Sequence, residues 1–249
     1  MVVTVASAGG VPNDGSAEAA VVNLTGVAGT APTYLSLFPT NASGGCAYTG
    51  THAPPFSTIN LTAGAVAANR VMVELGPASS GGSDDALCVY NAAGTINVLI
   101  DANGWYGSST APASPAGYQY QAIAPTRICD TRSVSTSCLK GAVGAAHSVV
   151  IPVAGDGDIP AIGGSAPVVA VIANLTAVAP TQTTFLTLYP ANLLHQPTVS
   201  DLNLGAGAVL PNLAVVELDT TGDAHDGDIS LYNSAGSVNA IIDIEGWFQ

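Results

Sequence analysis

The chain contains the same ordered series of segments twice, and a chain of this kind folds as two similar units placed one after the other. Val21–Thr25 returns as Ile172–Thr176, and Tyr34–Pro39 returns as Phe185–Pro190, in both cases 151 residues later. Four more pairs follow in the same order: Ser57–Leu61 with Ser200–Leu204, Asn69 with Asn212, Val89–Gly94 with Leu231–Gly236, and Asp101–Tyr106 with Asp243–Phe248. The first of these four has an offset of 143, so the first copy carries eight extra residues, in the loop that holds Cys46. We infer an internal duplication.

Within each copy the hydrophobic residues recur with a period of two, which is typical of β-strands with one buried face. In Arg70–Leu75 and in Thr95–Ala102 every second residue is aliphatic. Short β-rich runs alternate with Gly, Pro, Asn and Ser, a pattern that favours a sandwich or a barrel, and no segment has the spacing and caps of an amphipathic helix. The sequence therefore predicts an all-β protein made of two tandem antiparallel β-sandwich-like repeat domains. The expected boundaries are a first domain at 1–107, a Ser/Pro/Ala linker at 108–117 and a second domain at 118–249.

The two copies differ at their start. Pro12 matches Pro160, so most of residues 118–152 have no counterpart in the first copy, which is expected to lack one or two N-terminal strands. Three explanations stay open: the chain is a piece of a longer protein, which we favour; the first domain is shorter by nature; or a neighbouring molecule donates a strand to an unpaired edge. Under the last explanation, copies of the chain associate with one another through β-strand edges.

Charged residues are scarce and mostly acidic, with 4 Lys and Arg against 17 Asp and Glu and a formal net charge of −13. Nucleic-acid binding needs clustered basic side chains, so the composition argues against it. The hydrophobic share of 48% is ample for a core and argues against disorder. No run of 18 apolar residues is present, so we expect no membrane insertion.

Four cysteines, none of them in a C-x-x-C pair, favour two disulfides over a zinc site. Among three possible connectivities we prefer Cys129–Cys138, which closes a short polar loop, and Cys46–Cys88, which stays inside one copy. Disulfides indicate an oxidising, extracellular setting. Buried free thiols are the alternative.

The second copy contains an ordered series of motifs, Pro125–Arg132, Asn174–Thr176, Pro197–Asn203, Leu231–Gly236 and Asp243–Phe248. Together they resemble a module of roughly 120 residues that is repeated in secreted proteins of actinobacteria and other, often soil-dwelling, bacteria, with the pattern P-x-R-x-x-D-T-R, N-x-T, P-x-x-S-x-L-N, L-Y-N-x-x-G and D-x-x-G-Y/W-F. The resemblance covers nearly the whole chain, once completely and once without the first motif. It implies an exported protein in which such modules stand in arrays or beside hydrolases, and it implies no reaction and no ligand. Cys129 replaces a usually aliphatic residue of the module, which suggests a local disulfide added in this copy.

Basic side chains are concentrated in one segment, where Arg127, Asp130 and Arg132 lie close together. A functional interpretation makes them a fork that binds a carboxylate or a sugar. We favour an internal structural clamp, in which the guanidinium groups meet Asp130, Asp243 or Glu245, because a buried guanidinium is nearly always paired.

Aromatic residues end the last strand of each copy, with Trp105 in the first and Trp247 in the second, and Tyr118 and Tyr120 add candidates nearby. Exposed rings of this kind stack on sugars. We favour the alternative that they plug the end of the sandwich, since large rings bury much area.

Other chemistry has weaker support. Asp223, Asp226 and Asp228 offer oxygen ligands for calcium, but their spacing does not match an EF-hand loop, and Asp-Gly pairs are also favoured hairpin turns. We therefore expect no cofactor and no metal, with calcium left as an alternative. The four histidines lie in expected loops or strand ends, and no nucleophile elbow is present, so we expect no catalytic residue and no enzyme.

The leading hypothesis is a secreted, non-catalytic, structural or adhesive repeat module of the cell surface or extracellular space, with self-assembly as an added possibility. The alternative is a carbohydrate-binding module, attached to a larger exported hydrolase or cell-wall protein, with cell-wall polysaccharide as its partner. A hydrolase with an unrecognised site is the third hypothesis.

Overall fold

The computed structural model describes residues 1–80, 82, 84–107, 117–134, 137–138, 140–156, 158–163 and 168–249, without the side chains of residues 84 and 85. Within these residues the regular structure is all β-strand, paired antiparallel throughout, and no helix is present. The predicted all-β, sandwich-like class is therefore confirmed. No helix of the described chain has the length and apolar character needed to cross a membrane.

The chain divides into two compact units, Met1–Gly117 (unit 1) and Tyr118–Gln249 (unit 2). Most of the predicted linker, residues 108–116, lies outside the described residues.

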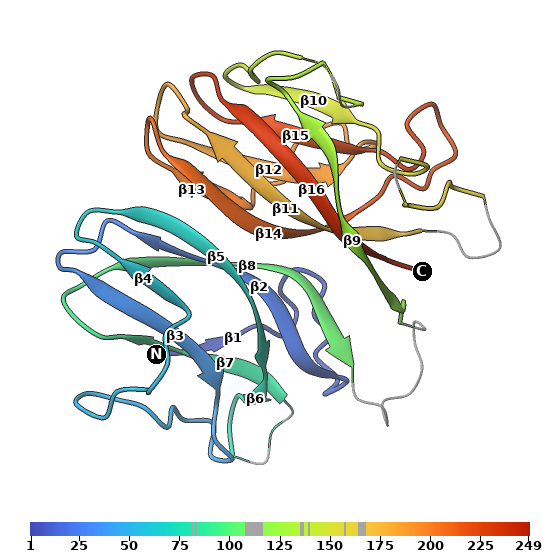
Figure 1. The fold of residues 1–249 in the computed structure, drawn as a ribbon. Coiled ribbons are helices and arrows are strands. Elements are labelled where there is room, and N and C mark those ends of the chain that lie inside the picture. Colours follow the sequence, from blue (N-terminus) through green and yellow to red (C-terminus); the bar gives the residue numbers. More distant parts are fainter. Residues whose placement is uncertain are drawn as a thin grey trace. The chain divides into compact units, whose positions relative to one another are not determined.

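Unit 1 is a sandwich of two sheets that face each other across a hydrophobic core (Figure 1). One sheet has the order β1-β7-β3-β4, with β6 beside β7, and the other has the order β5-β2-β8. The strands are β1 (Val2–Thr4), β2 (Ala17–Val27), β3 (Thr33–Pro39), β4 (Ile59–Leu61), β5 (Val66–Glu74), β6 (Gly76–Pro77), β7 (Asp84–Asn91) and β8 (Asn97–Gly107). Leu24, Leu35 and Leu87 come from both sheets and meet in the interior, where each is fully buried.

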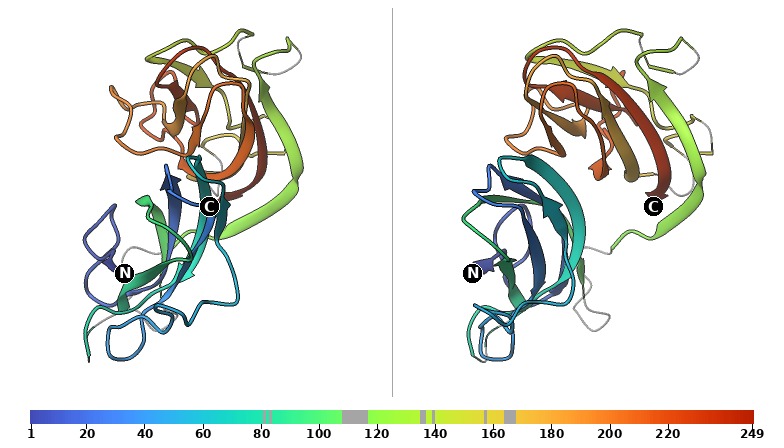
Figure 2. Two further views of the ribbon diagram at one scale, coloured as in Figure 1. Left: turned by 90° about the vertical axis from the view of Figure 1, so that its left-hand side faces the viewer. Right: turned by 60° about the vertical axis from the view of Figure 1, so that its left-hand side comes forward.

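Unit 2 is also a two-layer sandwich, which Figure 2 shows from two further sides. Its sheets have the orders β10-β15-β12-β13 and β14-β11-β16-β9. The strands are β9 (Tyr120–Asp130), β10 (His147–Ile151), β11 (Ala170–Val178), β12 (Thr184–Pro190), β13 (Leu202–Leu204), β14 (Val209–Glu217), β15 (Ile229–Asn233) and β16 (Asn239–Phe248). Along β11 the burial alternates residue by residue, because successive side chains of a strand point to opposite faces.

The strand orders of the two units correspond. β2 lies between β5 and β8 just as β11 lies between β14 and β16. The β2–β8 pairing and the β11–β16 pairing shift register at matching places, after Val21 and after Ile172. β1 of unit 1 pairs with β7 as β10 of unit 2 pairs with β15. β9 has no counterpart among the described strands of unit 1, so the expected shortfall of one or two strands is one strand, at the free side of β8.

Candidate functional site

The structure contains the two disulfides that the sequence favours. Cys46 bonds Cys88, 42 residues later, and so ties the loop after β3 to β7. Cys129 bonds Cys138, nine residues later, and so ties the end of β9 to the loop after it. All four cysteines of the chain are thus paired, which fits an oxidising, extracellular environment.

The predicted clamp consists of two separate ion pairs. Arg127 on β9 donates from Nε and Nη2 to the two carboxylate oxygens of Asp243 on β16, at 2.7 and 3.1 Å. Arg132 donates from Nε and Nη2 to Asp130, at 2.9 and 2.8 Å. Both arginine side chains are about half exposed, so the expectation that these guanidinium groups are buried is wrong. Arg127 lies on the edge strand β9 and Arg132 in the loop after it, so both side chains face water in part, where such a pair contributes little to stability.

The Arg132–Asp130 pair predicts a pH-dependent difference in stability. The side-chain hydrogen bonds from Arg132 lower the pKa of Asp130 to about 2, so folding favours its ionised form. That contribution is present above about pH 4 and is lost as the pH falls toward 2. We expect Arg132→Ala to lower the melting temperature of unit 2 at pH 7, and the gap to the unchanged protein to close between about pH 4 and pH 2. Thermal melts at several pH values measure this, with Lys140→Ala as a control that also removes one positive charge. A gap of constant size down to pH 2 would contradict the prediction.

The four aromatic candidates divide into two groups. Trp105 and Trp247 are partly buried and pack against the cores of their own units, as the plug hypothesis expects. Tyr118 and Tyr120 are exposed, and the Tyr120 hydroxyl donates to the backbone oxygen of Glu245 at 3.0 Å. The tyrosines are therefore surface residues of unit 2, whereas Trp247 packs against its core.

The acidic loop of unit 2 uses its carboxylates to hold its own turns. Asp223 accepts a hydrogen bond from the backbone of His225 at 2.7 Å, and Asp226 accepts one from the backbone of Gly222 at 3.0 Å. Asp228 lies 3.4 Å from the His225 ring, and burial raises the pKa of its carboxyl. Within the described part of the chain, no three His, Cys, Asp or Glu side chains gather as a metal-binding group.

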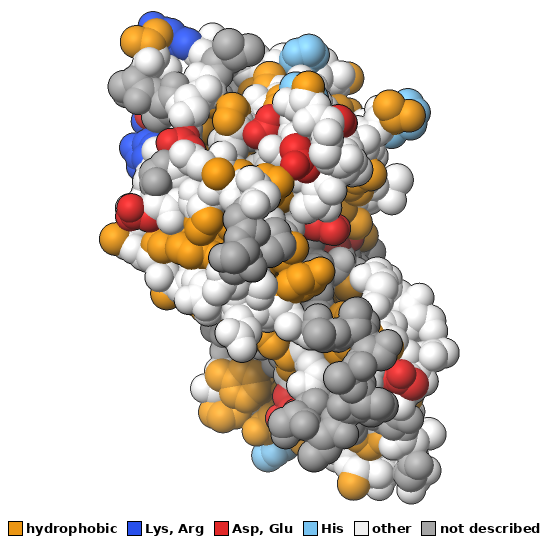
Figure 3. All heavy atoms as spheres, turned by 90° about the vertical axis from the view of Figure 1, so that its right-hand side faces the viewer, with side chains coloured by type: hydrophobic (Ala, Val, Ile, Leu, Met, Phe, Trp, Pro, Cys, Tyr) orange, Lys and Arg blue, Asp and Glu red, His pale blue; other side chains and the backbone are white. Residues whose placement is uncertain are grey.

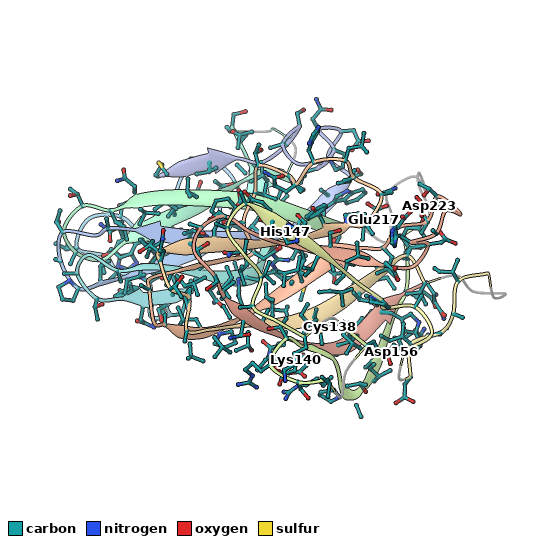
Figure 4. The ribbon with its side chains drawn as sticks, turned by 90° about the horizontal axis from the view of Figure 1, so that it is seen from above. Cys138, Lys140, His147, Asp156, Glu217 and Asp223 are labelled. Atoms are coloured by element: carbon teal, nitrogen blue, oxygen red, sulfur yellow. A yellow bond between two sulfur atoms is a disulfide. The ribbon has the colours of Figure 1, made fainter. Side chains whose placement is uncertain are left out.

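Apart from the pairs named above, the titratable side chains labelled in Figure 4 do not gather at one place. In Figure 4, His147, Asp156 and Asp223 occupy separate places. Asp156 accepts a hydrogen bond from Ser137, while its sequence neighbour Gly157 lies outside the described residues. On the face shown in Figure 3 the acidic side chains are scattered over the surface.

The residues that recur in both copies form the same internal hydrogen bonds in each unit. The amide of Asn60 donates to the Ser57 hydroxyl at 3.0 Å, and the equivalent Asn203–Ser200 bond measures 2.6 Å. In the Asn-x-x-Gly turn after β7 the Asn91 amide donates to the backbone oxygen of Gly94, and Asn233 does the same to Gly236. Further bonds repeat as Thr33–Asn91 with Thr184–Asn233, and Asn69–Thr58 with Asn212–Asp201. The recurring motifs therefore form and hold turns.

The loop between β3 and β4, residues 40–58, is the aromatic loop of unit 1. It folds over the outer face of the β7-β3 pair and is anchored there by side chains of both strands. Ser36 donates from its hydroxyl to the backbone oxygen of Phe56 at 2.6 Å, and the Tyr90 hydroxyl donates to that of Gly50 at 3.2 Å. The Cys46–Cys88 disulfide adds a covalent anchor. The loop that carries the eight extra residues of the first copy is thus anchored to β3 and β7.

Three rings of the aromatic loop meet on its surface. Tyr48 stacks on His52, with ring centroids 5.3 Å apart and planes 19° apart, and Phe56 approaches Tyr48 edge-on at 6.0 Å. Phe38 of β3 supports Tyr48 from below at 5.1 Å. Phe56 is 44% exposed.

This ring cluster was not predicted from the sequence. Tyr48, His52 and Phe56 are spaced four residues apart within the segment that carries the extra residues. An insertion with a regular aromatic spacing was the available signal. The loop path that brings the rings together depends on anchors in β3 and β7, which are distant in sequence.

Fold and site together define a class, a disulfide-bonded all-β protein of two sandwich units with one aromatic surface loop. No protein-family model matches the chain, and no curated protein matches it. The resemblance to the secreted bacterial module therefore stays a prediction that rests on its motifs.

Proposed function

We propose that this protein is a secreted, non-catalytic structural or adhesive module of the cell surface or extracellular space. The observation that carries the proposal is that the recurring motif residues form hydrogen bonds within their own unit. The Asn, Ser and Thr side chains that appear in both copies donate to or accept from turn groups of their own unit. Residues used in this way hold a scaffold, and a polar group that is buried must find such a partner.

The covalent structure supports the export part of the proposal. Each unit carries one disulfide, and bonds of this kind persist in oxidising compartments and are rare in the cytosol. The resemblance to a module of exported bacterial proteins points in the same direction. The scarcity of basic residues agrees with a role that does not involve nucleic acid.

Carbohydrate binding is the second candidate function, and the aromatic loop favours it. Carbon–hydrogen faces of sugars pack on exposed aromatic rings, and Tyr48, His52 and Phe56 offer three rings on a loop that is held in place. Tyr120, the exposed candidate of unit 2, has Phe248 as its ring neighbour at 5.6 Å. Unit 1 is therefore the better candidate for a sugar platform.

One binding experiment separates the two functions. The full chain is incubated with purified bacterial cell walls and with insoluble polysaccharides, with and without soluble sugars, beside the variants Phe56→Ala and, as an exposed aromatic outside the loop, Tyr118→Ala. A structural or adhesive module is expected to associate with cell surfaces in a way that soluble sugars and Phe56→Ala leave unchanged. Sugar-inhibited retention that falls at least tenfold in Phe56→Ala and persists in Tyr118→Ala would establish the second function instead. Release of soluble sugar from any polysaccharide would contradict both.

A further inference from the structure

The side of β8 that faces away from β2 is the feature of unit 1 that the proposed function leaves unused. In unit 2 the equivalent strand β16 lies between β11 and β9. β8 has β2 on one side and no strand of the described chain on the other. An edge of this kind presents unpaired backbone N–H and C=O groups to an incoming strand.

The core-facing side chains of β8 are also incompletely covered. Ile96, Val98, Ile100 and Ala102, in and just before β8, are partly buried hydrophobic residues at the border of the core. The equivalent residues of unit 2 are at most 1% exposed: Val238, Ala240, Ile242 and Ile244. β9 accounts for the difference, since it pairs with β16 and sends Ile128, with 0% exposure, into the core of unit 2. Unit 1 therefore has a core that is open along one strand.

We propose that β8 is an acceptor for an extended segment of another polypeptide that has the chemistry of β9. The segment carries an arginine opposite Asp101, followed directly by an aliphatic residue that enters the core beside Ile100. Unit 2 supplies the pattern, because Arg127 pairs there with Asp243 and the next residue is Ile128. This inference concerns the edge of unit 1 and does not rest on the adhesive function proposed above.

Charge complementarity favours such a segment. Residues 1–107 contain one basic and six acidic residues, so unit 1 attracts a strand with a positive charge. The aliphatic residue is expected to contribute more than the arginine. Its burial removes apolar surface from water, whereas the Arg127–Asp243 pair that serves as the pattern is half exposed. Arg70 of β5 stands in the same row as Asp101, across Asn23 of β2. This basic residue of unit 1 is a second reason to expect the smaller contribution from the arginine of the segment.

A second copy of the chain is a less suitable occupant. Its strand of the right chemistry, β9, already covers β16, and that strand is tied by the Cys129–Cys138 disulfide. Donating β9 would open one core in order to close another, with no net gain of buried surface. A separate β9-like segment has no such cost.

The contact is expected along the first half of β8, Asn97–Asp101. Beyond it the loop after β1 approaches the strand, where a Cβ placed on Gly9 would lie 2.6 Å from the Cβ of Ala102. This loop already occupies the space beside Ala102.

The test uses the full chain and a fluorescent peptide with the sequence of residues 126–133 carrying Cys129→Ser, because residues 127–131 face the part of β16 that is equivalent to Asn97–Asp101. Fluorescence anisotropy is expected to show saturable binding of one peptide per chain. Ile128→Asp in the peptide is expected to weaken binding at least tenfold, and Arg127→Ala two- to threefold. N-methylation of peptide amides that face the acceptor is expected to abolish binding. Because these changes lie in the peptide, the fold of the protein is the same in every measurement.

Hydrogen–deuterium exchange locates the bound peptide. Protection of the β8 amides, with those of β5 and β16 unchanged, is the expected result. The proposal is overturned by an absence of binding at millimolar peptide, by equal binding of the Ile128→Asp peptide, or by protection of β16 in place of β8. Concentration-dependent dimers that protect β8 and resist competition by the peptide would overturn it in favour of a second copy as the occupant.

Discussion

Replacing Cys46 and Cys88 by alanine is expected to lower the free energy of unfolding of unit 1 by about 4 kcal/mol, because the disulfide closes a long loop in the unfolded chain. The two cysteines are 42 residues apart, and the cost of ordering a loop grows with the logarithm of its length. The same change releases the aromatic loop from β7. We therefore expect unit 1 to unfold first and the Tyr48–His52 stack to become disordered.

The measurement is a denaturant titration followed by tryptophan fluorescence. The chain has two tryptophans, Trp105 in unit 1 and Trp247 in unit 2, so replacing either one by phenylalanine leaves a signal from one unit. The matched control is alanine at Cys129 and Cys138, which are nine residues apart and should cost unit 2 about 3 kcal/mol. A larger loss from the shorter loop would contradict the dependence on loop length.

Asn233→Ala is expected to destabilise unit 2 by about 3 kcal/mol, since it removes several hydrogen bonds at a fully buried position. The Asn233 amide donates to the backbone oxygens of Val143, Gly144 and Gly236, at 2.9, 3.1 and 3.2 Å. Its carbonyl accepts from the Thr184 hydroxyl at 2.6 Å. Alanine removes all four bonds at a position that water reaches poorly, and the Val143 oxygen keeps only its bond from the Val238 N–H.

The equivalent residue of unit 1 provides the control. Asn91 donates to Gly94 and accepts from Thr33 in the same way, but it is half-buried, so water replaces part of what alanine removes. Asn91→Ala should therefore cost unit 1 about 1 kcal/mol. Denaturant titrations with one tryptophan per variant resolve the two effects. Equal losses in both units would show that burial does not set the cost.

Local patterns predicted the parts of the structure that depend on local chemistry. The period-two runs Arg70–Leu75 and Thr95–Ala102 became β5 and β8, and the absence of helical spacing was matched by the described residues. The shortfall of the first copy was visible from unequal lengths before Val5 and Val153. In each case, neighbouring residues along the chain carry the relevant information.

Features that depend on how distant segments meet were not predictable in this way. The half exposure of Arg127 follows from the edge position of β9, and that of Arg132 from its place in the loop after the strand, neither of which a motif states. The stacking of Tyr48 on His52 requires the loop to cross the outer face of β3 and β7. The open core of unit 1 became visible when the burial of Ile100 was compared with that of Ile242.

The Cys46–Cys88 bond also determines the effect of a cut in the backbone of the aromatic loop. Residues 49–53 are exposed and lie between the two cysteines, where a protease meets accessible peptide bonds. A cut there leaves both fragments joined through sulfur, with β3 still paired to β7. A protein built this way keeps its first unit in one piece after nicking, for as long as its surroundings stay oxidising.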